Sequence, residues 1–249
     1  MRVISRLDIK GENLIKGIKF EGLRPIGCPI ERAKKYYNDG IDEIICIDAV
    51  ASLYGRNNAI ELVKEISKNI FLPITVCGGI RTIEDARNII LCGADKIGIN
   101  TAAVQQPKFL TMLAKEFGSQ SIVLSVEAKK ISPTKWEVYT NSGRDPTGID
   151  VKVWIKQAID YGIGSVFLTS IDNDGTKLGF DNELCKEIFE ICDVPLVICG
   201  GLGKIKDLTV LTNKSGINGF AAASAFHYNL LQIKEIKRFL IDNKINVRD

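Results

Sequence analysis

One phrase of the sequence occurs twice, about half a chain apart. Residues 73–80 read Pro-Ile-Thr-Val-Cys-Gly-Gly-Ile, and residues 195–202 read Pro-Leu-Val-Ile-Cys-Gly-Gly-Leu. In each copy an apolar run rich in β-branched residues ends at two glycines, which is typical of a buried parallel strand that breaks into a tight turn. Paired glycines expose backbone N–H groups, and such a turn suits a phosphate. The repeat therefore predicts a doubled α/β fold with anion-binding turns.

Strand-like and helix-like segments alternate along the whole chain. The expected strands are 3–9, 44–48, 73–80, 96–100, 122–127, 166–170, 196–199 and 219–223. The expected helices are 29–40, 59–69, 83–91, 109–117, 151–161, 182–192, 205–211 and 231–242. Residues 10–28 are expected to form a polar connection, and residues 129–150 an insertion with an extra hairpin arm.

Eight β/α units in a chain of 249 residues predict a single (β/α)₈ barrel. The repeat divides it into half-barrels of approximately residues 1–119 and 120–249. An open doubly wound sheet is the alternative, but it does not explain a two-fold internal repeat.

Composition limits the classes of function. The chain is 45% hydrophobic and 25% charged, with a formal net charge of +3 and interspersed charges, so no basic block indicates nucleic acid. No apolar run is long enough for a membrane span, and the charged N-terminus is unlike a secretion signal. The seven cysteines lack metal-site spacing and His227 is the single histidine, so we expect no metal and no cofactor. Reduced thiols indicate a cytoplasmic protein.

Two carboxylates close matching strands of the two halves. Asp8 ends the first expected strand and Glu127 ends the fifth, and each is followed after one residue by a lysine. In a (β/α)₈ barrel the carboxyl ends of the strands form the active site. Either acid alone also fits a solvated strand end, but their matching positions favour a general acid–base pair.

Polar residues at other strand ends group around the two glycine turns. One group consists of Gly79, Asn100 and Thr101, and the other consists of Gly201, Gly175, Asp174 and Ser224. Two such groups on opposite sides of the mouth suit a long ligand with a phosphate at each end. Asn, Thr and Ser also cap helices at such positions, and the sequence does not separate the two roles.

Motifs throughout the chain resemble one family. They include residues 7–10 (Leu-Asp-Ile-Lys), 93–103 (Gly-Ala-Asp-Lys-Ile-Gly-Ile-Asn-Thr-Ala-Ala), 168–176 (Leu-Thr-Ser-Ile-Asp-Asn-Asp-Gly-Thr) and 222–227 (Ala-Ala-Ser-Ala-Phe-His). From residue 1 to about residue 248, the chain resembles the cyclase subunit of imidazole glycerol phosphate synthase, from histidine biosynthesis.

This resemblance implies a (β/α)₈ barrel that binds a bis-phosphorylated ribulosyl-aminoimidazole carboxamide nucleotide. It also implies a heterodimer, in which a glutaminase subunit docked at the opposite face sends ammonia through the barrel. The implied products are imidazole glycerol phosphate and aminoimidazole carboxamide ribotide.

The resemblance further implies roles for single residues. Asp8 matches the catalytic aspartate, Lys16 matches the lysine of the mobile first loop, and Glu127 stands at the second catalytic position. The family's phosphate-binding positions fall on Gly79, Asn100, Thr101, Asp174, Gly175, Gly201 and Ser224. At the other end of the strands, the ammonia entrance and the partner face fall on Arg2, Glu43, Lys96 and Asp95.

Three residues depart from the family pattern. Glu127 replaces an aspartate, and moving a carboxylate by about 1 Å can cost on the order of a hundredfold in rate. Arg6 replaces a small side chain on the same inward face as Asp8, so we expect it to pair with Asp8 or Glu127 and to lower the pKa of that carboxyl group. Ser165 stands where the family usually has glutamate at the ammonia entrance.

These departures leave a second hypothesis beside the cyclase. They resemble a paralogous branch, found with a glutaminase-like subunit and a sugar amidotransferase, that supplies ammonia for amidino groups on bacterial surface sugars. In that hypothesis the chain activates a glutaminase and conducts ammonia to a third protein. The isomerase of the histidine pathway shares the doubled barrel, but the Phe-Gly-Ser-Gln and Thr-Ser-Ile-Asp phrases favour the cyclase.

Overall fold

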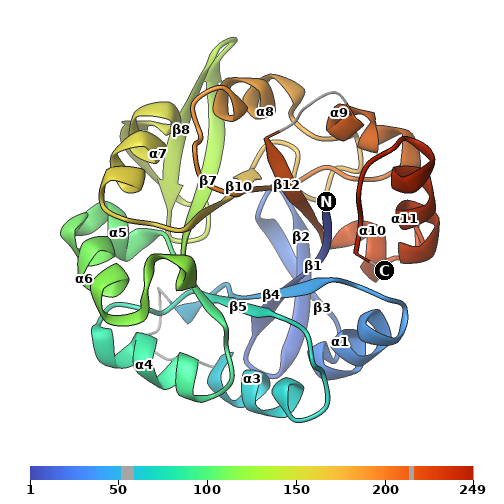
Figure 1. Ribbon diagram of the computed structural model, residues 1–249, viewed down its shortest axis with the longest axis horizontal. Coiled ribbons are helices and arrows are strands. Elements are labelled where there is room, and N and C mark those ends of the chain that lie inside the picture. Colours follow the sequence, from blue (N-terminus) through green and yellow to red (C-terminus); the bar gives the residue numbers. More distant parts are fainter. Residues whose placement is uncertain (52–58, 213–215, 249) are drawn as a thin grey trace.

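The first and last parallel strands pair with each other and close the sheet into a barrel (Figure 1). The computed structural model describes residues 1–51, 59–212 and 216–248. Within these residues the barrel has eight parallel strands: β1 (Arg2–Lys10), β4 (Glu43–Asp48), β5 (Ile74–Cys77), β6 (Lys96–Ile99), β7 (Ile122–Ser132), β10 (Ser165–Ser170), β11 (Leu196–Cys199) and β12 (Ile217–Ala222). The predicted (β/α)₈ barrel is confirmed.

Helices connect the barrel strands and surround the barrel (Figure 1). They are α1 (Pro29–Asn38), α3 (Ala59–Ser67), α4 (Ile83–Leu91), α5 (Thr101–Gln105), α6 (Lys108–Phe117), α7 (Val151–Asp160), α8 (Asn182–Phe189), α9 (Thr209–Thr212), α10 (Ser224–His227) and α11 (Ile233–Asp242), with 3₁₀ turns at Ser119–Ser121 and Ile205–Leu208. Buried apolar residues three or four positions apart, such as Ile233, Ile236 and Leu240 of α11, face the sheet. Among the described residues, no helix has both the length and the apolar composition to cross a membrane.

Apolar side chains pack against both faces of the barrel sheet, because successive strand residues point to opposite faces. On β1, Val3 and Leu7 belong to the large core between sheet and helices. Ile4 belongs to a smaller inner cluster with Ile45, Cys77, Val123, Phe167, Val197, Cys199 and Ala221. The middle of the barrel is therefore a packed interior, and polar chemistry is confined to its two ends.

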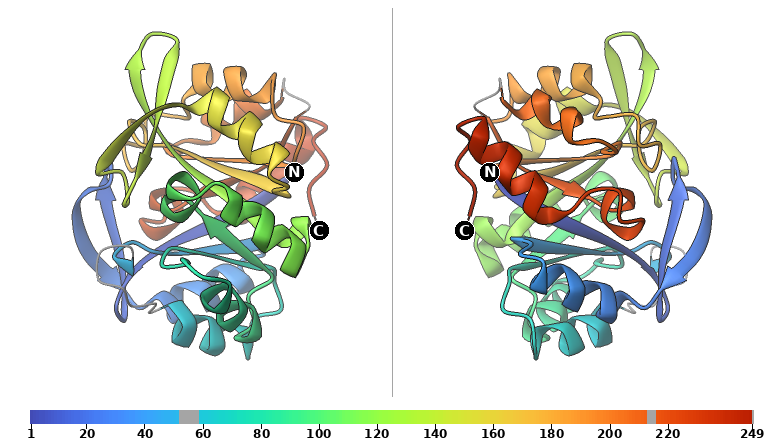
Figure 2. Two further views of the ribbon diagram at one scale, coloured as in Figure 1. Left: turned by 90° about the vertical axis from the view of Figure 1, so that its left-hand side faces the viewer. Right: turned by 90° about the vertical axis from the view of Figure 1, so that its right-hand side faces the viewer.

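The connection expected at residues 10–28 contains a β-hairpin, which was not predicted from the sequence. β2 (Asn13–Ile18) pairs with the end of β1 and with β3 (Glu21–Gly27). The hairpin lies at the end of the barrel opposite both chain termini (Figure 2). Its glycines interrupted the apolar alternation, yet Gly17 is required, because a Cβ there would lie 2.1 Å from the Glu21 carbonyl oxygen.

The insertion expected at residues 129–150 is a three-stranded antiparallel arm. β7 continues past the barrel and pairs with β8 (Lys135–Thr140), which pairs with β9 (Asp145–Asp150). The turn between β8 and β9 folds back over the carboxyl ends of the barrel strands, where Ser142 Oγ donates a hydrogen bond of 2.8 Å to the Ala49 carbonyl. We call these carboxyl ends, with the β2–β3 hairpin and this turn, the mouth.

Candidate active site

Both repeated glycine pairs form left-handed turns at the mouth. The φ angles are 95° and 73° at Gly78 and Gly79, and 103° and 102° at Gly200 and Gly201. A Cβ at Gly201 would lie 1.9 Å from the Gly179 carbonyl oxygen, so no larger residue fits. The tight turns predicted from the repeated phrase are therefore present.

The first cradle is the cavity at the first glycine turn, with a volume of about 210 Å³. Its lining includes the three predicted residues Gly79, Asn100 and Thr101, together with Arg81 and Ser142. The last two were not predicted. Arg81 directly follows the repeated phrase of residues 73–80 and was a detectable signal, whereas Ser142 comes from the inserted arm.

Thr101 and Asn100 also hold the inserted arm over this cradle. Thr101 Oγ1 accepts a hydrogen bond of 3.1 Å from the Asn141 N–H, and Asn100 Nδ2 donates one of 3.0 Å to the Tyr139 carbonyl. Both residues therefore have structural partners besides any anion.

The second cradle is a cavity of about 10 Å³ lined by the predicted Asp174, Gly175, Gly201 and Ser224. Ser224 Oγ is buried and has no hydrogen-bond partner among the described residues. Asp174 differs from the others, because its carboxylate accepts a hydrogen bond of 2.5 Å from Lys16 Nζ. A hydroxyl without a partner suits an anion, whereas the carboxylate is already occupied by a cation.

The three predicted catalytic residues, Asp8, Lys16 and Glu127, come together around a cavity of about 20 Å³, which we call the chamber. β1, the hairpin and β7 supply them. Lys16 Nζ lies 3.7 Å from Asp8 Oδ2, and Arg6 Nε donates a hydrogen bond of 2.8 Å to Asp8 Oδ1. Glu127 Oε2 instead accepts a hydrogen bond of 2.8 Å from the Gly143 N–H.

The two carboxyl groups of the chamber differ in acidity. Burial alone would raise the pKa of Asp8, but the charges of Arg6 and Lys16 hold that pKa below its ordinary value. Burial raises the pKa of Glu127 to about 7, against the opposing effects of the Gly143 N–H and Arg6. The Asn100 side chain lowers the pKa of Glu127 slightly, and burial outweighs this effect as well.

A larger cavity of about 1320 Å³ lies outside the chamber and is rich in cations. They are Lys10, Lys16, Lys19, Arg24, Lys129, Arg144 and Lys177, against the acids Glu21 and Asp172. Of these cations, only Lys16 was predicted at the site. The others come from the two antiparallel insertions, except Lys177, which lies in the loop after β10. The cavity favours a polyanionic ligand.

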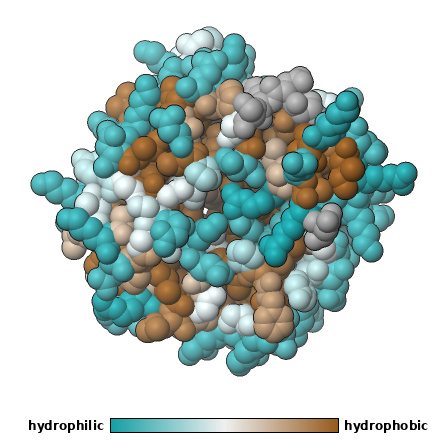
Figure 3. Space-filling model, viewed as in Figure 1, coloured by the Kyte–Doolittle hydropathy of each residue, from teal (hydrophilic) through white to brown (hydrophobic). Residues whose placement is uncertain are grey.

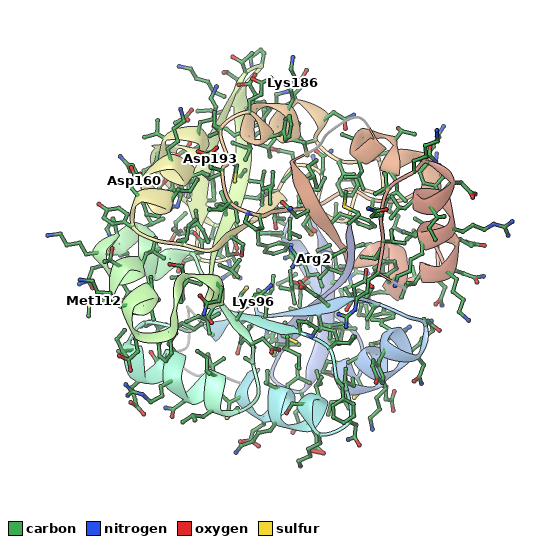
Figure 4. The ribbon with its side chains drawn as sticks, viewed as in Figure 1. Arg2, Lys96, Met112, Asp160, Lys186 and Asp193 are labelled. Atoms are coloured by element: carbon green, nitrogen blue, oxygen red, sulfur yellow. The ribbon has the colours of Figure 1, made fainter. Side chains whose placement is uncertain are left out.

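The opposite end of the barrel gathers the residues predicted at the ammonia entrance. Arg2 Nη1 lies 2.6 Å and Lys96 Nζ 3.5 Å from Glu43 Oε1. Figure 4 shows Arg2 and Lys96 near the barrel axis, with Met112 and Asp160 on the surrounding helices. Asp95 is exposed, and its Oδ2 accepts a hydrogen bond of 2.8 Å from the Ile74 N–H. Ser165 begins β10 at this end and leaves Glu43 as the one carboxylate shared by the two cations.

Fold and mouth together define a (β/α)₈-barrel protein with paired carboxyl groups and glycine turns at the carboxyl ends of its strands. Residues 2–232 match the family described as histidine biosynthesis protein, and the chain belongs to this family. It is similar to the imidazole glycerol phosphate synthase subunit HisF of Legionella pneumophila, at 51% identity over 207 residues, which are 83% of this chain and 98% of that protein. The protein of the same name from Pyrococcus furiosus is 44% identical over 247 residues, 99% of this chain and 98% of that protein.

Proposed function

We propose that this chain is the cyclase subunit of imidazole glycerol phosphate synthase. It uses ammonia to convert a bis-phosphorylated ribulosyl-aminoimidazole carboxamide nucleotide into imidazole glycerol phosphate and aminoimidazole carboxamide ribotide. The observation that carries the proposal is a pair of unlike carboxyl groups, Asp8 and Glu127, in one chamber at a mouth with two glycine cradles. The names of both relatives favour this function over the sugar-amidotransferase alternative.

The two phosphates of the nucleotide bind at the two cradles, the second of them from the larger cavity, which Gly175 and Ser224 also line. In the first cradle the glycine turn and Arg81 supply donors, and in the second the unpartnered Ser224 hydroxyl donates to a phosphate oxygen. The cations that line the larger cavity balance the negative charge of the two phosphates. A ligand with one phosphate uses half of this arrangement, which is why the site suits a bis-phosphate.

The chamber divides the proton transfers. Asp8, held ionised by two cations, serves as the base, and Glu127, whose raised pKa of about 7 lets it keep a proton close to neutral pH, serves as the acid. A volume of about 20 Å³ holds one molecule of the size of water or ammonia. The nucleotide does not fit while Phe20, at the tip of the hairpin, lines the chamber, so the hairpin withdraws when the nucleotide binds.

A glutaminase subunit docks at the opposite end of the barrel and supplies the ammonia. That face carries hydrophilic side chains at its centre with hydrophobic ones around them (Figure 3). Phe71 and Leu91, which precede β5 and β6, are 79% and 77% exposed. Exposed apolar side chains around Arg2, Glu43 and Lys96 are typical of an interface. Asp95, exposed at the same end, offers a carboxylate at its rim.

Turnover by the unmodified protein tests this function. We expect the purified chain, given the nucleotide and ammonium chloride, to form both products in the absence of any partner. Binding of the nucleotide without product formation above background would reject the cyclase and favour the ammonia-conducting alternative. Co-elution with the cognate glutaminase in size-exclusion chromatography tests the partner separately.

A further inference from the structure

Arg6 lies at the mouth end of the barrel interior, between the inner apolar cluster and the chamber. β1 directs Ile4, Arg6 and Asp8 to the same inward face, and Ile4 belongs to the inner apolar cluster. The Arg6 side chain is 5% exposed. Its guanidinium therefore depends on the protein for all its hydrogen bonds, and these fix where the side chain points.

The guanidinium contacts both the chamber and the neighbouring strands. Nε donates a hydrogen bond of 2.8 Å to Asp8 Oδ1, and Nη1 lies 3.9 Å from Asp174 Oδ1. Nη1 also donates hydrogen bonds of 3.4 Å to Thr169 Oγ1 and 3.8 Å to Cys199 Sγ. Contacts with β10 and β11 hold the far end of the side chain, so Nε is fixed against Asp8.

Four charged groups form one buried network: Arg6, Lys16, Asp8 and Asp174. Two cations balance two carboxylates within it. Taking such groups out of water costs several kcal/mol per ion, and apolar replacements of buried ion pairs are often as stable. Stability alone therefore does not explain an arginine at this depth, directly above an apolar layer.

Glu127 lies in the same chamber but outside this network. It forms no ion pair with any described residue, and its carboxyl group contacts the Gly143 N–H. The two carboxyl groups thus face one cavity with different partners. Arg6 also forms part of the chamber wall, and its guanidinium lies 5.1 Å from the centre of the Phe20 ring.

We propose that Arg6 is a positioning residue for the cyclisation: it fixes Asp8 as the anionic member of the carboxyl pair and leaves the other oxygen, Oδ2, beside Lys16 in the chamber. This inference rests on the proposed function of the mouth. Arg6 acts through Asp8 and the chamber wall rather than by a proton transfer of its own. The glutamate at position 127 is then the member that carries the proton.

The charged groups around each carboxyl define what a change at Arg6 does. The charged and titratable groups near Asp8 come from four elements. They are Arg6 of β1, Lys16 of the hairpin, Asp174 of the segment after β10, and the imidazole of His227 in α10. Burial lowers the pKa of His227 to about 4, so this group is neutral at physiological pH. Glu127 faces the guanidinium, Asp8 and the Cys77 thiol. Loss of the guanidinium leaves Asp8 with Lys16 as its one cationic neighbour.

The test compares Arg6→Met, which keeps the length and removes the charge, with Arg6→Lys, which keeps the charge. The matched control is Arg2→Met, which removes an arginine from the same inward face of β1, at its other end. The ¹³C NMR signals of labelled Asp and Glu carboxyl groups, assigned with Asp8→Asn, report each titration. We expect the Asp8 titration to move up by roughly 1 to 3 pH units in Arg6→Met, by less in Arg6→Lys, and not at all in Arg2→Met.

Turnover provides the second readout, measured against pH at a constant concentration of unprotonated ammonia. The acid limb of kcat should move up with the Asp8 titration in Arg6→Met and be largely restored in Arg6→Lys. An Asp8 titration unchanged by Arg6→Met would overturn the inference, as would a uniform loss of kcat with an unmoved acid limb. If Arg6→Met does not fold, Arg6→Gln, which also removes the charge, is measured by the same criteria. An unmodified protein without turnover, whose Asp8 titration still depends on Arg6, would uphold the action of Arg6 on Asp8 and reject the proposed function.

Discussion

Asp8 on β1 and Glu127 on β7 occupy matching places in the barrel, but the surroundings of the two carboxyl groups shift their pKa values in opposite directions. At the end of β1, Asp8 is surrounded by two cations that outweigh the effect of burial on its pKa. At the matching place on β7, where this strand leaves the barrel, Glu127 has a backbone N–H as its closest partner, and burial raises its pKa to about 7. A doubled barrel therefore supplies two equivalent positions, and the segments packed above them make the positions chemically different.

The largest effect is expected from removing either carboxyl group. Asp8→Asn and Glu127→Gln should each lower kcat by about 10² to 10⁴, the usual contribution of a general acid or base. Affinity for inorganic phosphate should stay nearly unchanged in Asp8→Asn, because Asp8 lines neither cradle, whereas Glu127 also lines the first cradle and its replacement should leave only the second cradle unaffected. The two measurements are steady-state turnover and phosphate titration on the same preparations. A Glu127→Gln variant with near-normal kcat would contradict the comparison of the two carboxyl groups, since Glu127 would then take no part in the proton transfers.

The next effect is on stability and distinguishes the two carboxyl groups directly. Between pH 4.5 and about 7 folded Glu127 keeps a proton that the unfolded chain has lost, so stability falls as pH rises through this window. Glu127→Gln removes the titrating group, so the variant does not lose this stability as pH rises. The variant should gain about 1 to 3 kcal/mol in free energy of unfolding, relative to the parent, between pH 5 and pH 8.

Urea unfolding at the two pH values measures this difference. Glu12→Gln is the matched control, because Glu12 is exposed in the turn before β2 and its replacement should give the same difference at both pH values. A Glu127→Gln variant that behaves like the control would contradict the assignment of the proton to Glu127.

The smallest effects compare the two cradles. Ser224→Ala removes a hydroxyl without a partner, so we expect stability to change by less than about 0.5 kcal/mol and phosphate affinity to fall about tenfold. Thr101→Val removes the acceptor of the Asn141 N–H, so it should also cost about 1 kcal/mol of stability. Thermal unfolding and phosphate titration check both variants. Equal stability losses would show that Ser224 has a structural partner after all.

The fold was predictable because its signals are local. Apolar runs marked the barrel strands, and the doubled Cys-Gly-Gly phrase marked both turns and, through the convergence of parallel strands, both cradles. The hairpin at residues 10–28 was missed because glycines interrupt its alternation. Gly17 does not end a strand. It lies within β2, where the Glu21 carbonyl oxygen leaves no room for a Cβ.

The electrostatics of the site were not predictable, because they depend on contacts between distant segments. Asp174 was grouped with the phosphate donors, yet its carboxylate lies against Lys16, 158 positions earlier in the chain. Gly143 reaches Glu127 only because the inserted arm folds back over the mouth. Arg6 was expected to pair with Asp8 or Glu127, and the structure selects Asp8 through the contacts of Nη1 with β10 and β11.

The most direct test of the division between the two carboxyl groups is the protonation state of Glu127 itself. Infrared difference spectra of the unmodified protein and Glu127→Gln, recorded from pH 5 to pH 9, isolate the carbonyl signal of this one side chain. We expect a neutral carboxyl signal at pH 6 that disappears around pH 7 and is absent from the variant. A Glu127 already ionised at pH 6, with Asp8 carrying the proton instead, would contradict the account.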